Sequence, residues 1–378
     1  MSAKIWLSSP HMGGNELKYI HEAFDANWVA PLGPNVDGFE NDIENYLNTD
    51  VKVAALSAGT AALHLALIEC GVEHGDEVIC QSMTFSASAN PIAYLGATPI
   101  FVDSEKDTWN ICPIALEEAI NDRIAKGKTP KAILAVHLYG MPFKVDEVLA
   151  IANKFNIPLI EDAAEALGST YKGKKCGTFG RFGALSFNGN KIITTSGGGA
   201  LVCQTQEDKD KAVFLATQAR DNAPHYQHSH IGYNYRMSNI TAGIGRGQME
   251  VLEDRVAARR AMNNFYQALF ADIDGVTVFV EPTSDYFSNH WLSAILIDSK
   301  VAGKTREDLR LAFLEDEIES RPLWKPMHLQ PVFANSPYYG GKVAEELFEN
   351  GLCLPSGSNL TDAERERIAA KVNAVFGK

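Results

Sequence analysis

The sequence has no long hydrophobic run. Although 46% of its 378 residues are hydrophobic, no apolar stretch approaches the roughly 20 residues that a helix needs to cross a bilayer. The first residues, MSAKIWLSSPHMGGNE, also lack the apolar core of a secretory signal peptide. We therefore expect a soluble, cytoplasmic protein with no membrane partner.

Cysteine and positive charge are also scarce. The six cysteines form no CxxC pair and mostly lie inside apolar segments, which is typical of reduced, buried thiols and argues against a disulfide framework or a zinc site. The formal net charge of −13 argues against a nucleic-acid binder, because neutralising phosphates requires clustered Lys and Arg. We expect neither a bound metal nor a nucleic-acid partner.

The sequence does contain an alternation of apolar runs and amphipathic stretches. Between residues 51 and 202, runs such as VKVAAL, TPIFVD and KAILAVHLYG are separated by helical patterns. This alternation is typical of an α/β domain with a mostly parallel sheet that has helices on both faces. In such sheets, ligands bind at the carboxyl ends of the strands.

The flanking segments complete a two-domain plan. Residues 14–48 predict two helices broken at APLGP, because its prolines and glycine prevent helix continuation. Residues 238–273 predict one long helix that joins two lobes, and the strands and helices that follow residue 275 predict a smaller α+β domain. We place the large domain at residues 1–250 and the smaller one at residues 251–378.

One strand end predicts an anion site. SAGTAALHLAL follows a strand, so Ser57, Gly59 and Thr60 fall at the start of the next helix. Free N–H groups, a hydroxyl and the helix dipole converge there on an anion such as phosphate. A plain helix cap explains the same residues equally well.

A second strand end carries carboxylates. Glu161 and Asp162 end the apolar strand in IPLIEDAAEALG, and a carboxylate buried there requires a cation or a hydrogen-bond donor as its partner. The alternative is that Asp162 caps a helix formed by AAEALG.

Lys191 stands in SFNGNKIITTSGGGALV, between an apolar run and a stretch rich in Thr, Ser and Gly. The Gly and Ser residues allow a tight turn and a close approach of the backbone. A lysine taken at random lies on the surface, and this remains the alternative for Lys191.

Other candidates are weaker. Phe85 in TFSASANP follows a strand end, where an isolated aromatic more often belongs to the core. His225, His228 and His230 lie in a polar loop without an HExxH pattern or companion cysteines, so we do not assign them to a metal. His137 ends a strand and is equally well explained as a core histidine.

Together these groups suit one kind of ligand. A helix start ready for phosphate, a strand-end carboxylate, an aromatic and a lysine flanked by Ser and Gly match a planar, phosphorylated aldehyde with a cationic nitrogen. The residues alone permit this ligand without requiring it.

The same motifs, in this order, resemble the sugar aminotransferase family named DegT/DnrJ/EryC1/StrS, which uses pyridoxal 5′-phosphate (PLP) on the aspartate-aminotransferase type I fold. NGNKIITTSGGG and RPLWKPMH are most similar to enzymes of the UDP-N-acetylbacillosamine type, which aminate C4 of the sugar. The resemblance covers nearly the whole chain, through PHMGGNE, APLGP, SAGTAALHLAL, MTFSASANPIAYLGATPIFVD, HLYG, IEDAAEALGS, GTFGRFGALSFNGNKIITTSGGG, GYNYRMSNI and RPLWKPMH.

The resemblance implies roles for the residues already singled out. Lys191 becomes the lysine that bonds to the PLP aldehyde and then shuttles a proton. Asp162 pairs with the pyridine nitrogen and so makes the ring an electron sink. Phe85 stacks on the ring. The phosphate is held by Gly59, Thr60 and Ser186.

The resemblance also implies a homodimer with shared active sites, because in this family an Asn in the GYNYR loop reaches the phosphate of the neighbouring subunit's cofactor. Asn234 is that residue here. Arg236 is a candidate partner for the nucleotide diphosphate, and Asn188 and His328 are candidates for contacts with the substrate.

Two positions depart from the common pattern of the family. Many relatives have Gln at the position of Glu165, where an amide donates to the phenolate oxygen of the cofactor, whereas an ionised carboxylate would repel it. Either Glu165 is protonated in the cofactor site or it faces elsewhere. Ser196 replaces the Glu of the commoner GEGG sequence, so the role of that acid is not carried over.

The implied reaction has two halves. L-Glutamate gives its nitrogen to PLP, which leaves pyridoxamine 5′-phosphate and 2-oxoglutarate, and the nitrogen then passes to C4 of a nucleotide-linked 4-keto-6-deoxy sugar. UDP-2-acetamido-4-keto-2,6-dideoxyhexose is the expected acceptor, with a GDP-perosamine-type acceptor as the alternative. Two other functions are possible on this fold: a sugar dehydratase, which would have His in place of Lys191, and a non-catalytic regulator, which would be expected to lose Lys191 or Asp162.

Overall fold

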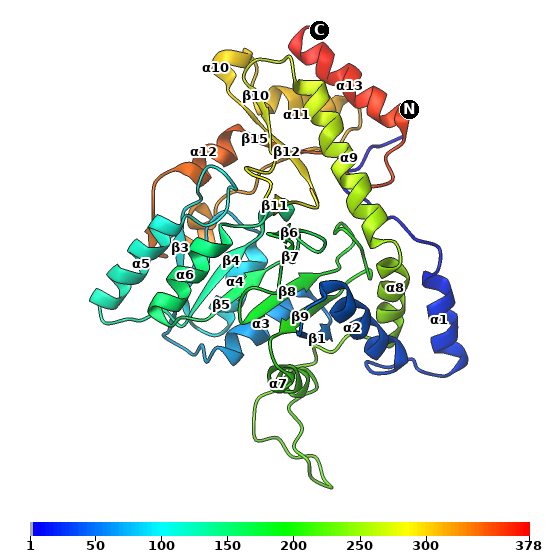
Figure 1. Ribbon diagram of the computed structural model, residues 1–378, viewed down its shortest axis with the longest axis vertical. Helices are drawn as coiled ribbons and strands as arrows, with labels where there is room; N and C mark the ends of the chain where they lie inside the picture. The colour runs from blue at the N-terminus through cyan, green and yellow to red at the C-terminus, as the bar shows by residue number, and fades with distance from the viewer. Residues whose placement is uncertain (1–2) are drawn as a thin grey trace.

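The computed structural model describes residues 3–378 and is built around an eight-stranded sheet (Figure 1). β9 is antiparallel to both of its neighbours, and the other five neighbouring pairs are parallel, which confirms the predicted α/β class. In spatial order the strands are β1 (Lys52–Leu56), β9 (Gly199–Cys203), β8 (Phe182–Ser186), β5 (Leu159–Asp162), β4 (Ala132–Val136), β2 (Glu77–Gln81), β3 (Thr98–Val102) and β14 (Tyr338–Tyr339).

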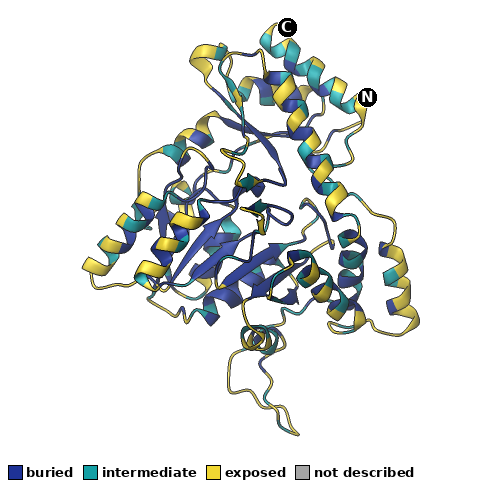
Figure 2. Cartoon of the chain, in the orientation of Figure 1, coloured by how far each residue is buried: buried dark blue, intermediate teal, exposed yellow. Residues whose placement is uncertain are grey.

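Helices bury both faces of this sheet, which appears dark blue between partly exposed helices in Figure 2. Burial on two sides explains why the strands are continuous apolar runs rather than alternating ones. One face is covered by α3 (Gly59–Glu69), α4 (Ser86–Tyr94) and α7 (Gln206–Ala216). The other is covered by α2 (Pro34–Leu47), α5 (Pro113–Ala125), α6 (Val145–Phe155) and α8 (Asn239–Met249), with α1 (Glu16–Asp25) packed on α8.

A second lobe is built around a four-stranded antiparallel sheet with its own core. Ile5, near the N-terminus, packs in this core and pairs with Ile318. The division at residues 250 and 251 stays a prediction. The sheet comprises β10 (Val276–Val278), β12 (Ser293–Ile297), β15 (Gly351–Leu354) and β13 (Arg321–Pro322), and its core is completed by α9 (Leu252–Phe270), α11 (Arg306–Glu315) and α13 (Asp362–Phe376).

The remaining elements are short. Across residues 3–378, no helix combines the length and the apolar character needed to cross a membrane. The short elements are α10 (Ser299–Ala302), α12 (Val343–Asn350), the sheet of β11 (Tyr286–Phe287), β6 (Thr170–Tyr171) and β7 (Lys174–Lys175), and the 3₁₀ turns η1 (Leu138–Gly140), η2 (Met327–Leu329) and η3 (Pro331–Phe333).

The prediction for residues 14–48 is confirmed, because α1 and α2 flank the APLGP break and Pro34 is the first residue of α2. The prediction of one helix over residues 238–273 is wrong. Val251 leaves helical geometry between α8 and α9, and its N–H bonds to Gln248, three residues back. The glycines of α8 allow close packing, since a Cβ at Gly247 would lie 2.7 Å from the backbone nitrogen of Glu16.

The start of α3 is pressed against β9. A Cβ added to Gly199 would lie 2.3 Å from both the carbonyl carbon of Ala58 and the nitrogen of Gly59. No real Cβ makes contacts this short, so only glycine allows the helix to begin at this place. The packing of β9 therefore fixes where the N-terminus of α3 opens.

This contact gives a stability test. Gly199→Ala should lower the free energy of unfolding by about 1–3 kcal/mol, because the obstructing atoms are backbone and cannot swing aside. Gly197→Ala, two residues earlier, meets nothing within 4 Å and has no positive φ, so it should change stability little. Urea unfolding of both variants checks the prediction, and equal stability of the two would contradict it.

Candidate active site

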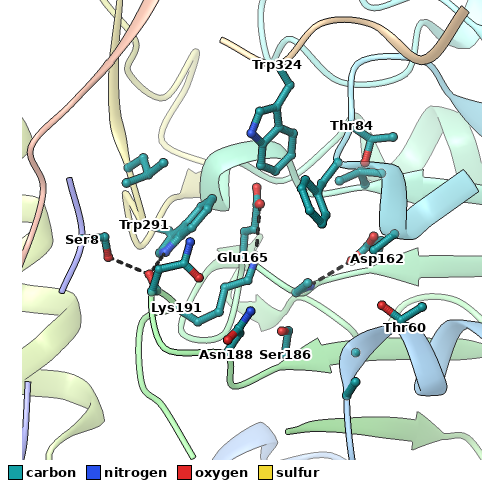
Figure 3. A pocket seen from close by; sticks show the side chains of 18 of the residues that line it. Ser8, Thr60, Thr84, Asp162, Glu165, Ser186, Asn188, Lys191, Trp291 and Trp324 are labelled. Carbon is teal, nitrogen blue, oxygen red and sulfur yellow. Dashed lines mark hydrogen bonds and ion pairs between the residues drawn. The ribbon is translucent and has the colours of Figure 1, made fainter. Parts of the chain in front are cut away.

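A cavity of about 510 Å³ opens at the carboxyl ends of the parallel strands. The segments that follow β1, β2, β5 and β8 form its floor. The second lobe closes it with Trp291 and Trp324 (Figure 3) and with Arg321. This is the position where the sheet topology predicts a ligand.

Lys191 enters this cavity from the turn after β8. Its side chain is only 12% exposed, and its Nζ lies 3.4 Å from Oε1 of Glu165 and 4.3 Å from the ring centroid of Trp291. Figure 3 shows the ion pair of Lys191 and Glu165 inside the cavity. The alternative of a lysine on the surface is therefore wrong.

Glu165 faces the cavity and is 4% exposed. Its Oε2 accepts a hydrogen bond of 2.7 Å from the backbone N–H of Tyr139. Burial raises the pKa of Glu165 to about 7, although the nearby Lys191 amine opposes the shift. Of the two predictions for Glu165, the one in which it faces elsewhere is excluded.

Asp162, at the end of β5, also lines the cavity. Its Oδ2 accepts 2.6 Å from Ser88 Oγ and its Oδ1 accepts 3.2 Å from the N–H of Ala164. Residues 163–168 form turns rather than a helix, so the helix-cap alternative is wrong. Glu161 does not line the cavity; it accepts from three backbone N–H groups and lies 2.8 Å from the buried His137, which confirms His137 as a core residue.

The N-terminus of α3 opens into the cavity beside Ser186. Gly59, Thr60 and Ser57 line this part, and no side chain caps the helix at Ala58. A Cβ on Gly59 would lie 3.0 Å from Cβ and 3.4 Å from Oγ of Ser186, so glycine keeps the cradle open. Free N–H groups of a first helical turn beside a hydroxyl fit a phosphate group.

Phe85 and Asn188 complete the predicted residues found at the cavity. Phe85 is 57% exposed, with its ring centroid 5.6 Å from that of Trp324, so one aromatic face is available to a planar ring. The core alternative for Phe85 is therefore wrong. Asn188 is exposed at the cavity wall, whereas Ser196 is not part of the lining.

Asn234 and Arg236 lie outside the cavity of their own chain. Asn234 is exposed at the base of the long loop that follows α7 in Figure 1. Arg236 forms an ion pair with Glu40 and donates 3.0 Å to the carbonyl of Ala55. Within this chain, Arg236 therefore joins α2 to β1 rather than reaching a ligand in the cavity.

His328 also lies outside the cavity lining. Its Nδ1 is 2.7 Å from Ser82 Oγ, and its ring stacks on Tyr338 at 3.8 Å. Burial lowers its pKa. His328 thereby ties the segment that carries Trp324 to the segment that carries Phe85. The loop histidines His225, His228 and His230 are exposed, and no group of metal ligands occurs among the described residues.

The second lobe and the N-terminal segment bring further residues to the cavity, which the sequence motifs did not indicate. These are Ser8, Trp291, Arg321 and Trp324. Trp324 lies within the RPLWKPMH motif, and Trp291 directly precedes the buried run that becomes β12. For Trp291 and Trp324, the signal in the sequence was an aromatic residue next to polar ones.

Comparison with known proteins identifies the chemistry. The sequence profile of the DegT/DnrJ/EryC1/StrS aminotransferase family matches residues 10–373. The chain is 50% identical over 372 residues to EpsN of Bacillus subtilis strain 168, described as a candidate pyridoxal phosphate-dependent aminotransferase, with 97% of this chain and 95% of EpsN covered. It is 36% identical to the GDP-perosamine synthase of Escherichia coli O157:H7, with 97% of both chains covered.

The fold agrees with the same family. A crystal structure of a DegT DnrJ EryC1 StrS aminotransferase from Brucella abortus superimposes with a TM-score of 0.89 at 29% identity, over 96% of both chains. The predicted cofactor and enzyme class follow from these matches.

The buried Glu165 makes stability depend on pH. Its pKa of about 7 in the folded chain lies above the ordinary value of about 4.3 in an unfolded chain, so the folded chain holds one more proton between these values. Stability should fall as the pH rises through this interval and level off above pH 7. Relative to Glu165→Gln, wild type should lose about 2–3 kcal/mol between pH 4.5 and 8.

Urea unfolding of the two cofactor-free proteins across this pH range measures the difference. In a Lys191→Ala background the opposing ammonium is gone, so the loss should be larger. A stability difference that does not change with pH would show that Glu165 is not held in this way.

Proposed function

The chain belongs to the DegT/DnrJ/EryC1/StrS aminotransferase family, and we propose that it transfers the amino group of L-glutamate to C4 of a nucleotide-linked 4-keto-6-deoxy sugar. Family membership makes it a PLP-dependent sugar aminotransferase. The observation that carries the proposal is the partly buried Lys191 amine, which lies in a cavity with a phosphate-ready helix start and a strand-end carboxylate.

The cavity residues fit PLP group by group. The N–H groups of Gly59 and Thr60 and the hydroxyl of Ser186 would hold its phosphate, and the exposed face of Phe85 would cover its ring. Asp162, oriented by Ser88, would pair with the pyridine nitrogen. When bound, PLP supplies an aldehyde that accepts nitrogen and a ring that spreads negative charge.

Lys191 and Glu165 would move protons. Lys191 Nζ would take the proton that the α-carbon of glutamate loses and deliver a proton to C4 of the sugar. Glu165, whose pKa is raised to about 7, would be neutral for much of the time near neutral pH and would then donate its proton to an acceptor in the cavity. The departure from the common Gln is therefore compatible with an oxygen atom on the cofactor at this position.

Two nucleotide-linked keto sugars are candidates for the acceptor. UDP-2-acetamido-4-keto-2,6-dideoxyhexose is our first candidate, because NGNKIITTSGGG and RPLWKPMH resemble the bacillosamine-type sequences. A GDP-linked 4-keto-6-deoxy sugar is the second candidate, favoured by the 36% identity to a GDP-perosamine synthase. The product would be an amino sugar for a surface glycan or a glycoprotein.

We further propose a homodimer in which each subunit completes the site of the other. Asn234 is exposed and outside its own cavity, so it is free to reach the phosphate of the neighbouring subunit's cofactor. Arg236 would have to give up its bonds to Glu40 and Ala55 before it could bind a diphosphate. We therefore retain Asn234 as the residue of this loop that reaches the neighbouring site, whereas Asn188, at the cavity wall, is the stronger candidate for contact with the sugar.

An absorbance titration tests the reaction. Purified protein with PLP should absorb near roughly 410–430 nm, lose this band on addition of L-glutamate, and regain it with one keto sugar. Recovery with the UDP sugar would support our first candidate, and recovery with the GDP sugar would support the second. If the protein with PLP gave no band, or if Lys191→Ala kept full turnover, the proposed function would be wrong.

Mixed dimers test the shared site. Lys191→Ala and Asn234→Ala chains should each be weakly active or inactive alone, and co-folding them should recover about a quarter of wild-type sites, because half the dimers contain one intact site. Turnover of the mixed preparation, with each chain carrying a different tag, provides the measurement. No recovery, although mixed dimers are isolated, would place both residues in one subunit's site.

A further inference from the structure

A buried cation on the second lobe is linked to the lysine turn. Arg259 on α9 is 1% exposed. Burial alone, without a contribution from a neighbouring charge, lowers the pKa of its guanidinium to about 9. Removing a guanidinium from water without a carboxylate partner is costly. The neutral groups that its N–H groups bind are therefore essential to its placement.

Two hydrogen bonds hold this guanidinium, while its buried Nε has no hydrogen-bond partner among the described residues. Nη1 donates 2.7 Å to the backbone carbonyl of Trp291, and Nη2 donates 2.8 Å to Ser8 Oγ. Arg259 thereby holds two segments, residue 8 near the N-terminus and residue 291 before β12, in one place.

Both of these segments donate to a single carbonyl. Ser8 Oγ donates 2.6 Å and Trp291 Nε1 donates 2.7 Å to the backbone oxygen of Asn190. That oxygen belongs to the peptide bond that joins Asn190 to Lys191. Because Ser8 accepts from Arg259, its own proton is directed to Asn190, and the chain of donors has one direction.

The same segment also fixes what surrounds the amine. The ring of Trp291 lies 4.3 Å from Nζ of Lys191, and the backbone N–H of Trp291 donates 2.8 Å to Asn289 Oδ1. Asn289 Nδ2 in turn donates 2.8 Å to the backbone carbonyl of Glu165. Figure 3 shows Ser8, Trp291, Lys191 and Glu165 converging on one side of the cavity.

We propose that Arg259 and Ser8 are positioning residues that set the direction of the Lys191 amine through the carbonyl of Asn190 and through Trp291. The proposal rests on the role of Lys191 in the proposed function, because an amine that must meet two different carbon atoms needs an accurate placement. Arg259 suits this position since its planar fork reaches two acceptors in different segments, which a single ammonium does less well.

Ser8→Ala is the sharpest variant, because it removes one hydroxyl from the middle of the chain of donors. In the holoenzyme we expect kcat to fall by about three- to tenfold, the effect of one hydrogen bond, with the KM values of both substrates changed less than about twofold. Ser8→Thr keeps the hydroxyl and should recover most of the loss.

Arg259→Met removes the cation and keeps an apolar stem, and Arg255→Met is its matched control. Arg255 lies one turn earlier on α9 and also donates to a backbone carbonyl, that of Met12, at 3.0 Å. No hydrogen bond joins it to Ser8 or Trp291, both of which the structure describes. We expect Arg259→Met to lose turnover and Arg255→Met to keep it.

A second readout does not depend on turnover. In the full chain without cofactor, brief acetylation followed by mass spectrometry gives the labelling of Lys191 relative to Lys209, which is 17% exposed and paired with Glu40 and Glu44. Ser8→Ala should raise this ratio about three- to tenfold as the Lys191 amine is released. General loosening would raise the labelling of Lys209 as well and leave the ratio unchanged.

The outcomes separate the two proposals. Wild-type turnover and a wild-type labelling ratio in Ser8→Ala would overturn the positioning role, and so would equal losses in Arg255→Met and Arg259→Met. If Arg259→Met does not fold, the comparison of Ser8→Ala with Ser8→Thr still tests the positioning role. If wild type gave no absorbance band with PLP, the proposed function would fail, while the labelling ratio would still test whether Ser8 and Arg259 position the Lys191 amine.

Discussion

The contact between the Lys191 amine and the Glu165 carboxyl group is the interaction on which the rest of the site depends. Two groups that prefer water are held out of it at 3.4 Å, at a cost that their attraction alone does not offset. A raised pKa at Glu165 reduces this cost, because the carboxyl group is then neutral for part of the time near pH 7. A carboxyl group that changes its protonation near pH 7 thus lies beside the amine to which we assign the proton transfers.

Local sequence was sufficient to predict the side of the site that is formed by the ends of the parallel strands. Asp162 and Ser186 each end a strand, and β5 and β8 are parallel neighbours, so their side chains had to emerge at one edge of the sheet. Gly59 and Thr60 begin the helix after β1. Strand, turn and helix signals lie within a few residues of one another in each case, so the pattern fixes both the element and the end at which a side chain appears.

The other side of the site depends on contacts between distant segments. Ser8 and Arg259 are 251 residues apart, and Trp291 reaches Asn190 across 101 residues; neither contact leaves a period or a motif in the sequence. The predicted single helix over 238–273 failed for a related reason. The glycines of α8 lie inside an intact helix, where they serve close packing against α1 and α2. The chain leaves helical geometry at Val251, and the helical pattern of the sequence contains no local signal of this break.

The position of Arg259 on α9 connects these two halves. α9 packs against the core of the large sheet at its start and against the core of the second lobe further along. A change in its position therefore affects both lobes. A guanidinium on this helix, bonded to the carbonyl of Trp291 and the hydroxyl of Ser8, gives the second lobe a fixed reference point beside the lysine turn. A shift of α9 relative to the sheet would have to stretch these bonds or carry Asn190 with it. The orientation of the lysine and the arrangement of the lobes are therefore coupled through one buried charge, which explains why a costly group belongs at this place.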